Sequence, residues 1–340
     1  MISSDEKNFE VFNFHRVCFG GSVLGWSINE EKSQRLLDYF KSKGGLLIDT
    51  SDFYSEWVPG NSGGESERII GNWMEDRNCR RDIKVITKVG LYSKRIGLSR
   101  ENILRAADDS LKRLKTDYID VYMPHRTPTE EEYEGFVDAM SKLNRNGLIK
   151  SVGFSHCSPD NLETLAYLLL EKDIPLSICE DNFNIIEREA SERKIPLATG
   201  FGMQFIAARG LAGGFLSGKY SGIGKNYHFR IVRGQISHSF SSGAKAFSKK
   251  YRSSLTSASI SKYLELDTNH LFSTLKKISN VHEVNTASIA ISWILLQKSI
   301  SGVCVSFRSI DQLKGLQLVN LSNGEVDELN SISLKFNDRA

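Results

Sequence analysis

The sequence predicts an α/β fold, a (β/α)8 barrel in a single domain spanning residues 1–340. Three observations predict it. Eight short apolar segments with the length of buried strands alternate with segments of helical periodicity. No Pro- or Gly-rich linker divides the chain into two folded halves. A length of 340 residues is also common for one barrel. A doubly wound sheet is the alternative, because it shows the same alternation.

Strands are expected where apolar residues run without alternation, because a parallel sheet buries both of its faces. The central example is Leu46–Ile48, which follows Gly44-Gly45 and is followed by Asp49. A short hairpin is expected at 9–14, ahead of the barrel. The other segments expected as barrel strands are 16–19, 83–89, 118–123, 149–154, 175–179, 203–207 and 303–306.

Helices are expected where apolar residues recur at spacings of three and four. Ser99 and Ser158-Pro159 are suited to start two of them, and Thr129 with Glu132 has the spacing of a capping box. Each of these three signals is expected to precede a helix. The other helical segments are 31–42, 66–74, 185–193, 271–278, 287–297 and the residues from 311 onward.

Composition favours no particular macromolecular partner, since the net charge is only +3. Residues 1–10 lack the apolar run of a signal peptide, and no apolar stretch is long enough to cross a bilayer. We therefore expect a cytoplasmic protein that binds neither nucleic acid nor membrane. The five cysteines are odd in number and lack a C-x-x-C pair, which argues against disulfides and zinc. The oligomeric state is left open.

Four polar residues lie at or after the ends of successive strands. Asp49 follows the second strand and Tyr54 lies in the loop beyond it. Lys88 lies at the end of the third strand, and His125 follows the fourth. Because the carboxyl ends of barrel strands share one rim, we expect these four side chains to converge there.

Such a group is suited to carbonyl reduction. A phenol with a pKa of about 10 is a weak acid at neutral pH, and a nearby ammonium lowers that pKa. Tyr54 is expected to protonate the carbonyl oxygen while His125 donates a hydrogen bond to it. Each residue also has a structural interpretation: Asp49 and Lys88 as an ion pair, Tyr54 as a packing aromatic, His125 as a hydrogen-bonded structural histidine.

With these residues the chain resembles the aldo-keto reductase family over nearly its whole length. The family pattern of Asp, Tyr, Lys and His is met by the four residues above. Four further segments also resemble the family: 48–54, 64–71, 149–155 and 211–220. The resemblance implies a TIM barrel and metal-free, NADP(H)-dependent reduction of an aldehyde or ketone.

The cofactor site has no Rossmann G-x-G-x-x-G motif. Gly213 and Lys219 are suited to a pyrophosphate, although a flexible glycine turn is an equal alternative. Arg308 precedes a helix start and is suited to an anion, which the resemblance identifies as the 2′-phosphate, with Gln312 near the ribose. The cofactor-binding candidates are Gly21, Ser22, Asp49, Ser155, His156, Glu180, Arg209, Leu211, Gly213, Lys219, Ser306, Arg308 and Gln312.

The chain departs from the family around the nicotinamide. His156 and Glu180 stand where Asn and Gln are usual, and Ala208 where an aromatic ring often stacks. Arg209-Gly210 replaces Ser-Pro, and Leu316 replaces an Asn near the adenine. Glu180 is expected to face the amide or the positive ring, or to pair with Arg209. These departures bear on cofactor affinity and specificity.

A basic segment spans residues 221–263. It has eight Lys or Arg and no Asp or Glu, which gives it a charge of +8. Since the whole chain has a net charge of +3, the other residues together carry −5. One interpretation is a disordered surface loop, and the other is a lid over an anionic cofactor or a nucleotide-linked substrate.

The loop after Tyr54 resembles that of bacterial reductases with sugar-acting members. Trp26, Trp57 and Arg126 are candidate substrate contacts, which suggests a small carbonyl compound such as a keto-sugar. The Trp residues are equally suited to rim packing. Two other functions stay open: a non-catalytic NADP(H)-binding sensor or subunit, and a metal-dependent hydrolase, for which the sequence lacks clustered ligands.

Overall fold

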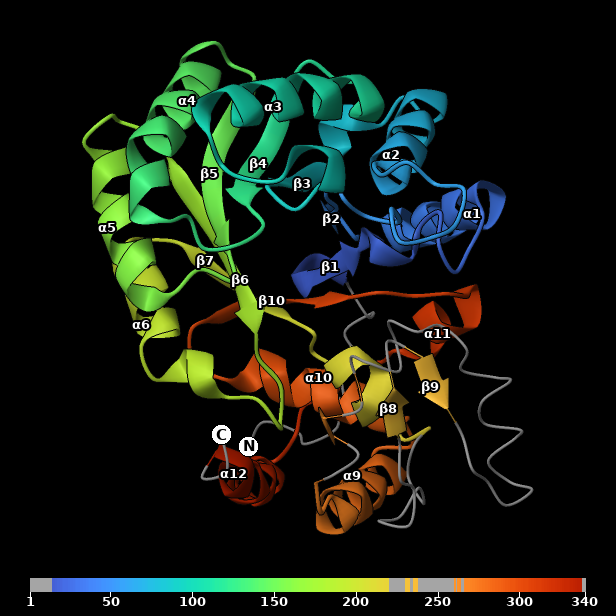
Figure 1. Cartoon of the computed structure of the whole chain (residues 1–340). Coiled ribbons are helices and arrows are strands. Elements are labelled where there is room, and N and C mark those ends of the chain that lie inside the picture. Colours follow the sequence, from blue (N-terminus) through green and yellow to red (C-terminus); the bar gives the residue numbers. More distant parts are fainter. Residues whose placement is uncertain are drawn as a thin grey trace, which may run out of the picture. The chain divides into compact units, whose positions relative to one another are not determined.

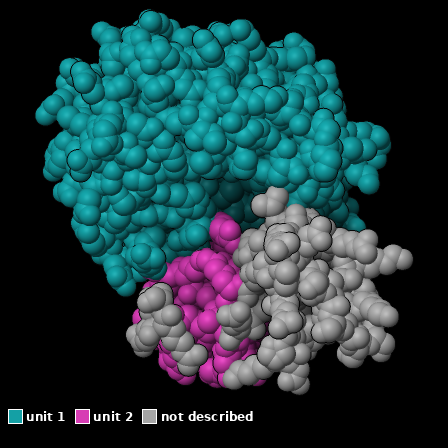
Figure 2. Space-filling view, viewed as in Figure 1, with its two compact units in different colours: residues 1–183, 189–208, 295–315 teal, residues 184–188, 209–294, 316–340 magenta. Residues whose placement is uncertain are grey.

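The computed structural model describes residues 14–219, 230–232, 235–237, 260, 262–263 and 266–337. The chain divides into two compact units, which Figure 2 colours separately. The first comprises Met1–Phe183, Glu189–Ala208 and Leu295–Gly315. The second comprises Asn184–Arg188, Arg209–Ile294 and Leu316–Ala340. The single-domain organisation stays a prediction.

The first unit contains a closed barrel of eight parallel strands (Figure 1). Around the barrel the order is β1, β10, β7, β6, β5, β4, β3, β2. The strands are β1 (Val17–Gly20), β2 (Leu47–Asp49), β3 (Lys84–Val89), β4 (Ile119–Pro124), β5 (Ile149–Ser155), β6 (Leu176–Asn182), β7 (Gln204–Ala208) and β10 (Ile300–Val305). The (β/α)8 barrel is confirmed. The doubly wound alternative is wrong, because β1 pairs with both β2 and β10 and closes the sheet.

Helices of this unit lie outside the strands in Figure 1. They are α1 (Glu30–Ser42), α2 (Glu65–Asp76), α3 (Arg100–Leu114), α4 (Tyr133–Arg145), α5 (Pro159–Leu170), α6 (Lys194–Gly200) and α11 (Ile310–Gly315). Short 3-10 turns connect them: η1 (Phe14–Arg16), η2 (Gly21–Val23), η3 (Arg80–Asp82), η4 (Ser93–Arg95), η5 (Glu130–Glu132) and η6 (Glu189–Ser191).

Side-chain caps start several of these elements as expected. Ser99 accepts a hydrogen bond from the Asn102 amide at 3.3 Å, and Ser158 accepts one from Asn161 at 3.3 Å. Thr129 and Glu132 form the capping box, which opens η5 directly ahead of α4. These bonds satisfy amides that have no partner within a first helical turn.

An apolar layer fills the barrel interior. Its side chains come from five strands and pack together: Cys18, Ile86, Val121, Met123, Ile178 and Ile206, with Leu47 and Cys304 packed against them. Side chains alternate across a strand, so the residue two positions further along each strand faces the same interior. The polar residues that end these strands therefore lie directly beyond this apolar layer.

One predicted helix is wrong. Residues 185–193 are mostly irregular, with only a 3-10 turn at Glu189–Ser191. The side chain of Asn184 accepts from the amides of Ile186 at 2.9 Å and Glu187 at 3.1 Å, and its backbone amide donates to the Glu187 carbonyl at 2.9 Å. The last bond runs opposite to those of a helix and closes a tight turn. The helix α6 begins later, at Lys194, where Pro196 is tolerated in the first turn. The helix expected from residue 311 onward is interrupted, because residues 316–322 are not helical and separate Ile310–Gly315 from Asn323–Asn337. The other barrel strands and helices lie within a few residues of their predicted bounds.

The second unit contains α9 (Asn269–Val281), α10 (Thr286–Leu296), α12 (Asn323–Asn337), the turn η7 (Ala212–Ser217) and an antiparallel pair, β8 (Arg230–Val232) and β9 (Gln235–Ser237). This strand pair was not expected. The rest of the basic segment lies largely outside the described residues. Whether it is a surface loop or a lid is therefore not tested by the described residues. The expected hairpin at 9–14 also lies outside them, except Phe14, which begins η1. Among the described residues, no helix combines the length and apolarity that a membrane crossing needs.

Candidate active site

Three charged side chains lie beyond the apolar layer of the barrel. Asp49, Lys88 and Glu180 come two positions after Leu47, Ile86 and Ile178, so they share the interior face of β2, β3 and β6. Only 2%, 1% and 5% of their surfaces, respectively, are exposed. Charges this deeply buried need partners, because water no longer solvates them.

Lys88 provides the positive charge at the centre of this group. Its ammonium donates hydrogen bonds to the Asp49 carboxylate and to the carbonyl of Thr50, the latter at 3.2 Å. It also lies 3.7 Å from Oε2 of Glu180. Burial favours the neutral amine, but the two carboxylates outweigh it and raise the pKa of Lys88 well above its ordinary value. Lys88 is therefore held as a cation.

Tyr54 reaches the same group from the loop after β2. Its hydroxyl lies 3.3 Å from Nζ of Lys88 and donates to Oδ2 of Asp49 at 3.1 Å. The expectation that Lys88 would lower the pKa of Tyr54 is not met. Lys88 does act in that direction, but burial and Asp49 raise the pKa of Tyr54 well above 10. The phenol therefore keeps its proton at neutral pH.

His125 completes the group of four. Its ring centroid lies 5.6 Å from that of Tyr54, and its Nδ1 lies 2.9 Å from the hydroxyl of Ser51. Burial and the charge of Lys88 hold the pKa of His125 well below its ordinary value, so the ring is neutral at pH 7. The partner at Nδ1 then decides which ring nitrogen carries the single proton.

Ser51 was not singled out from the sequence. Its hydroxyl lies between His125 and Asp52, at 2.9 Å and 3.3 Å, and accepts from the Phe53 amide at 3.2 Å. A serine two residues beyond the strand's carboxylate was the available signal. Its contact with His125 spans 74 residues of sequence and becomes visible only in the folded chain.

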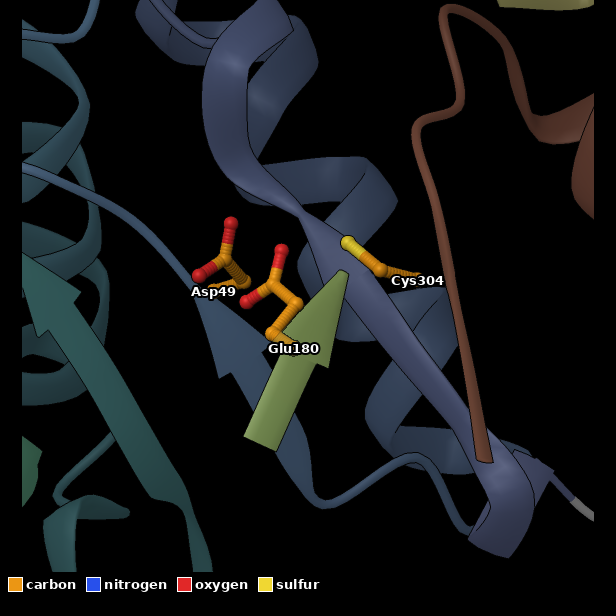
Figure 3. Close-up of side chains that lie close together, drawn as sticks. All are labelled: Asp49, Glu180 and Cys304. Carbon is orange, nitrogen blue, oxygen red and sulfur yellow. The ribbon is translucent and has the colours of Figure 1, made fainter. Parts of the chain in front are cut away.

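Asp49 and Glu180 face each other beside Cys304, as Figure 3 shows. Burial, and after it the negative charge of Glu180, raises the pKa of Asp49 to about 7. One oxygen of each carboxylate and the sulfur of Cys304 lie within 4.8 Å of one another. The Lys88 ammonium contacts both carboxylates, so a cation already occupies the position that their charges favour.

The expected nicotinamide side of the site lies at the ends of β5 and β6. Ser155 Oγ, Glu180 Oε2 and Asn182 Oδ1 are buried and lack a hydrogen-bond partner within the described part of the chain. A carboxamide has one acceptor and two donors, which fit a hydroxyl and carboxylate or amide oxygens. The residues present therefore fit a nicotinamide, although His156 and Glu180 differ from the Asn and Gln that the resemblance implies.

His156 is held away from these atoms. It adopts a left-handed backbone, with φ of 51°, and its Nδ1 lies 2.9 Å from Asp181. Asp181 also pairs with Lys194 of α6 and accepts from the Asn182 amide at 2.7 Å. Burial raises the pKa of Asp181, but His156 and Lys194 together lower it below its ordinary value. Neither Asp181 nor Lys194 was predicted as a site residue.

Further cofactor-binding candidates lie after β1 and after β10. Ser22 Oγ is 3.5 Å from Ser306 Oγ, and a Cβ on Gly20 would come within 2.5 Å of that hydroxyl, so β1 and β10 approach closely here. Gly21 follows directly in η2. Arg308 is exposed and lies 5.5 Å from the Trp26 ring, while its amide donates to Gln312 at 2.7 Å.

Four further candidates belong to the second unit: Arg209, Leu211, Gly213 and Lys219. Arg209 and Gly213 have positive φ, at 52° and 67°. Leu211 precedes η7, and Lys219 follows it with an exposed side chain. A Cβ on Gly214 would meet Nζ of Lys219 at 2.9 Å, so glycine allows the lysine to fold back over this turn.

The substrate candidates separate into two kinds. Trp26 and Trp57 pack edge to face at 5.6 Å, and Trp57 lies 6.3 Å from Tyr54. Arg126 instead forms a two-pronged pair with Glu132, at 2.8 Å and 2.5 Å. Glu132 also accepts from the Thr129 amide at 2.9 Å, and its pKa is lowered to about 2 because Arg126 and backbone amides outweigh burial. Arg126 thus supports the loop after β4.

Comparison with known proteins assigns the family. A model of the aldo/keto reductase family matches residues 16–333, and the chain belongs to that family. Versiconal hemiacetal acetate reductase of Aspergillus parasiticus is 30% identical over 57% of this chain and 61% of its own length. Probable aldo-keto reductase 1 of Glycine max is 24% identical over 95% and 86%. The uncharacterized oxidoreductase YrpG of Bacillus subtilis is 30% identical over 60% and 65%. These similarities support an oxidoreductase.

Proposed function

We propose that the protein is an NADP(H)-dependent oxidoreductase that reduces an aldehyde or ketone, with Tyr54 as general acid. One observation carries the proposal most directly. The Tyr54 hydroxyl lies within 3.3 Å of Lys88 Nζ and 3.1 Å of Asp49, beside a neutral His125. A bound nicotinamide would supply the hydride.

Each residue then has one task. Tyr54 keeps its proton until negative charge develops on the carbonyl oxygen. The alkoxide that then forms is a stronger base than the phenolate and takes the proton. Lys88 stabilises the phenolate that this transfer leaves. His125 donates a hydrogen bond to the same oxygen when the Ser51 hydroxyl turns its single proton from Asp52 to Nδ1, which leaves the ring proton on Nε2. The cell compartment we propose is the reducing cytoplasm, which the five free cysteines support.

For the cofactor we propose that Ser155 and Glu180 hold the carboxamide and that Arg308 holds the 2′-phosphate. The first assignment is supported by their buried unpartnered oxygens. The second is supported by the exposed position of Arg308. Replacing Arg308 by Ala should raise KM for NADPH more than KM for NADH, as steady-state kinetics would measure.

For the substrate we propose a small hydroxylated carbonyl compound, such as a keto-sugar. Trp26 and Trp57 offer apolar faces, and Trp57 Nε1 is buried without a hydrogen-bond partner among the described residues. An indole N–H so placed favours a ligand with an oxygen to accept from it. A panel of keto-sugars and unsubstituted alkanals would test this, and equal kcat/KM for both sets would contradict it.

Replacing Tyr54 by Phe tests the chemistry. We expect kcat to fall roughly 100-fold to 10,000-fold while NADPH still binds, because one proton donor is lost and the ring is kept. Tyr167→Phe is the control, since Tyr167 is 57% exposed and lies on α5. Unchanged turnover in Tyr54→Phe would refute the acid role. NADPH binding by the wild type without any turnover would favour the non-catalytic sensor.

A further inference from the structure

Two carboxylates share one ammonium in this site. Asp49 pairs directly with Lys88, and Glu180 reaches the same Nζ at 3.7 Å from the opposite side of the barrel. Strands β3 and β6 are separated by β4 and β5, so the Glu180 contact crosses the interior. With both acids ionised, the group would carry one excess negative charge in a place without water.

The surroundings of Glu180 offer it little else. Its Oε2 makes no hydrogen bond within the described part of the chain. Six titratable groups interact electrostatically with Glu180. They come from β1, β2 and its loop, β3, β6 and β10: Cys18, Asp49, Tyr54, Lys88, Cys179 and Cys304. Of these, Lys88 is the cation and the others are acids. Like charges so close together favour retention of a proton by one carboxylate.

We propose that Glu180 converts Asp49 from a fixed anion into the proton reserve of the site, so that Asp49 resupplies the proton that Tyr54 gives to the substrate. This inference rests on the proposed function. It concerns the position where the family usually carries Gln, which could hold the carboxamide but would add no charge.

Reduction consumes one hydride and one proton. The hydride and its two electrons would come to the carbonyl carbon from the reduced nicotinamide of the proposed function, which would be oxidised, and the carbonyl oxygen gains the Tyr54 proton, which gives the alcohol. The Asp49 O–H bond then breaks and the Tyr54 O–H bond forms again along their 3.1 Å hydrogen bond. Asp49 is left as a carboxylate paired with Lys88. A proton from water restores it before the next turnover.

The first test is infrared spectroscopy of the cofactor-free protein, in which a protonated carboxyl absorbs apart from a carboxylate. Below neutral pH the wild type should show a carboxylic acid band that Asp49→Asn removes. Glu180→Gln should lack the same band, because burial alone would then favour the proton on Asp49, against Lys88 and the Tyr54 hydrogen bond. Glu75→Gln, an equal charge change at an exposed pair with Lys115, should keep it. Burial and the charge of Glu67 raise the pKa of Asp52 to about 7, so Asp52 should also give a carboxylic acid band. That band should be equal in every variant.

The second test is the pH dependence of carbonyl reduction. Wild-type kcat should fall roughly tenfold for each pH unit above about 7, where Asp49 loses its proton. Glu180→Gln should show no such fall between pH 6 and 9, whereas Glu75→Gln should match the wild type. Glu180→Gln should fold, since Gln is nearly isosteric with Glu.

Three results would overturn the proposal: no Asp49 band in the wild type, a band that persists in Glu180→Gln, or identical pH profiles for the two enzymes. Failure of the proposed function looks different. A wild type that reduces no carbonyl compound would remove the relay, while the infrared bands would still decide whether Glu180 places a proton on Asp49.

Discussion

Glu180 and Asp181 are consecutive residues on one strand, yet they belong to opposite kinds of charge group. Glu180 faces the barrel interior, where two carboxylates share Lys88. Asp181 has its own ammonium from Lys194, a histidine partner and a backbone amide. The pKa of Asp49 in the first group is raised to about 7 by burial and Glu180, whereas that of Asp181 is lowered despite burial. Burial raises the pKa of both carboxyls, so their opposite net shifts follow from the charges beside them: a second carboxylate for Asp49, and a lysine and a histidine for Asp181.

The largest effect is expected from Lys88→Met, which leaves two buried carboxylates without a cation. We expect turnover to be lost and the free energy of unfolding to fall by about 3–5 kcal/mol at pH 8. Loss of Lys88 raises the pKa of Asp49 further above its unfolded value, so stability should decline as pH rises and recover toward pH 5. Urea denaturation at several pH values measures this.

Lys115→Met is the matched control, because Lys115 forms an exposed pair with Glu75 on the helix surface. Its effect should stay below about 1 kcal/mol and should not grow with pH. Equal losses for the two lysine variants would mean that the interior group is not short of positive charge.

Asp181→Asn should have a smaller effect with the reverse dependence on pH. The pKa of Asp181 lies below its unfolded value, so its stabilisation is present above pH of about 4 and is lost as pH falls. We expect a loss of about 1–3 kcal/mol at pH 7 that disappears in acid. Asp160→Asn, at an exposed pair with Arg193, serves as control in the same denaturation series. A loss that persists in acid would show that the Asp181 pairing is not what stabilises the protein.

Ser51→Ala tests the neutral residue of the site and should have the smallest effect. One hydrogen bond to His125 of about 1 kcal/mol corresponds to roughly fivefold in kcat, with KM for the cofactor unchanged. Ser42→Ala on α1 should have no effect, because that exposed hydroxyl donates to the Tyr39 carbonyl within its own helix. A change in cofactor KM alone would argue for a structural role of Ser51.

Much of the barrel could be predicted because local signals and burial agree. The run 83–89 is buried on both faces from Val85 onward, and Ser99 and Ser158 cap the helices that follow them. Strand ends of a barrel meet on one rim, which brings Asp49, Lys88 and His125 near each other from sequence alone. The helix expected at 185–193 failed because the backbone amide of Asn184 donates to the Glu187 carbonyl at 2.9 Å, a bond that runs opposite to the hydrogen bonds of a helix.

The energetics of the site could not be predicted in the same way. The charge of Lys88 taken alone does lower the pKa of Tyr54. The net shift is nevertheless upward, because burial and Asp49 outweigh Lys88. The contact between Lys88 and Glu180 joins residues on strands that do not pair. Arg126 follows His125 in the sequence and so resembled a substrate contact. Its salt bridge with Glu132 becomes visible only in the folded chain.

The alternation of β6 has a consequence for how this site can change in evolution. Loss of one residue within β6 ahead of Glu180 would exchange the two faces of the strand end and turn Asp181 toward the interior that holds Lys88. Loss of two residues would preserve the faces. Length variation inside β6 can therefore be absorbed only in even steps unless a bulge corrects it, whereas the loop before the strand is free of this restriction.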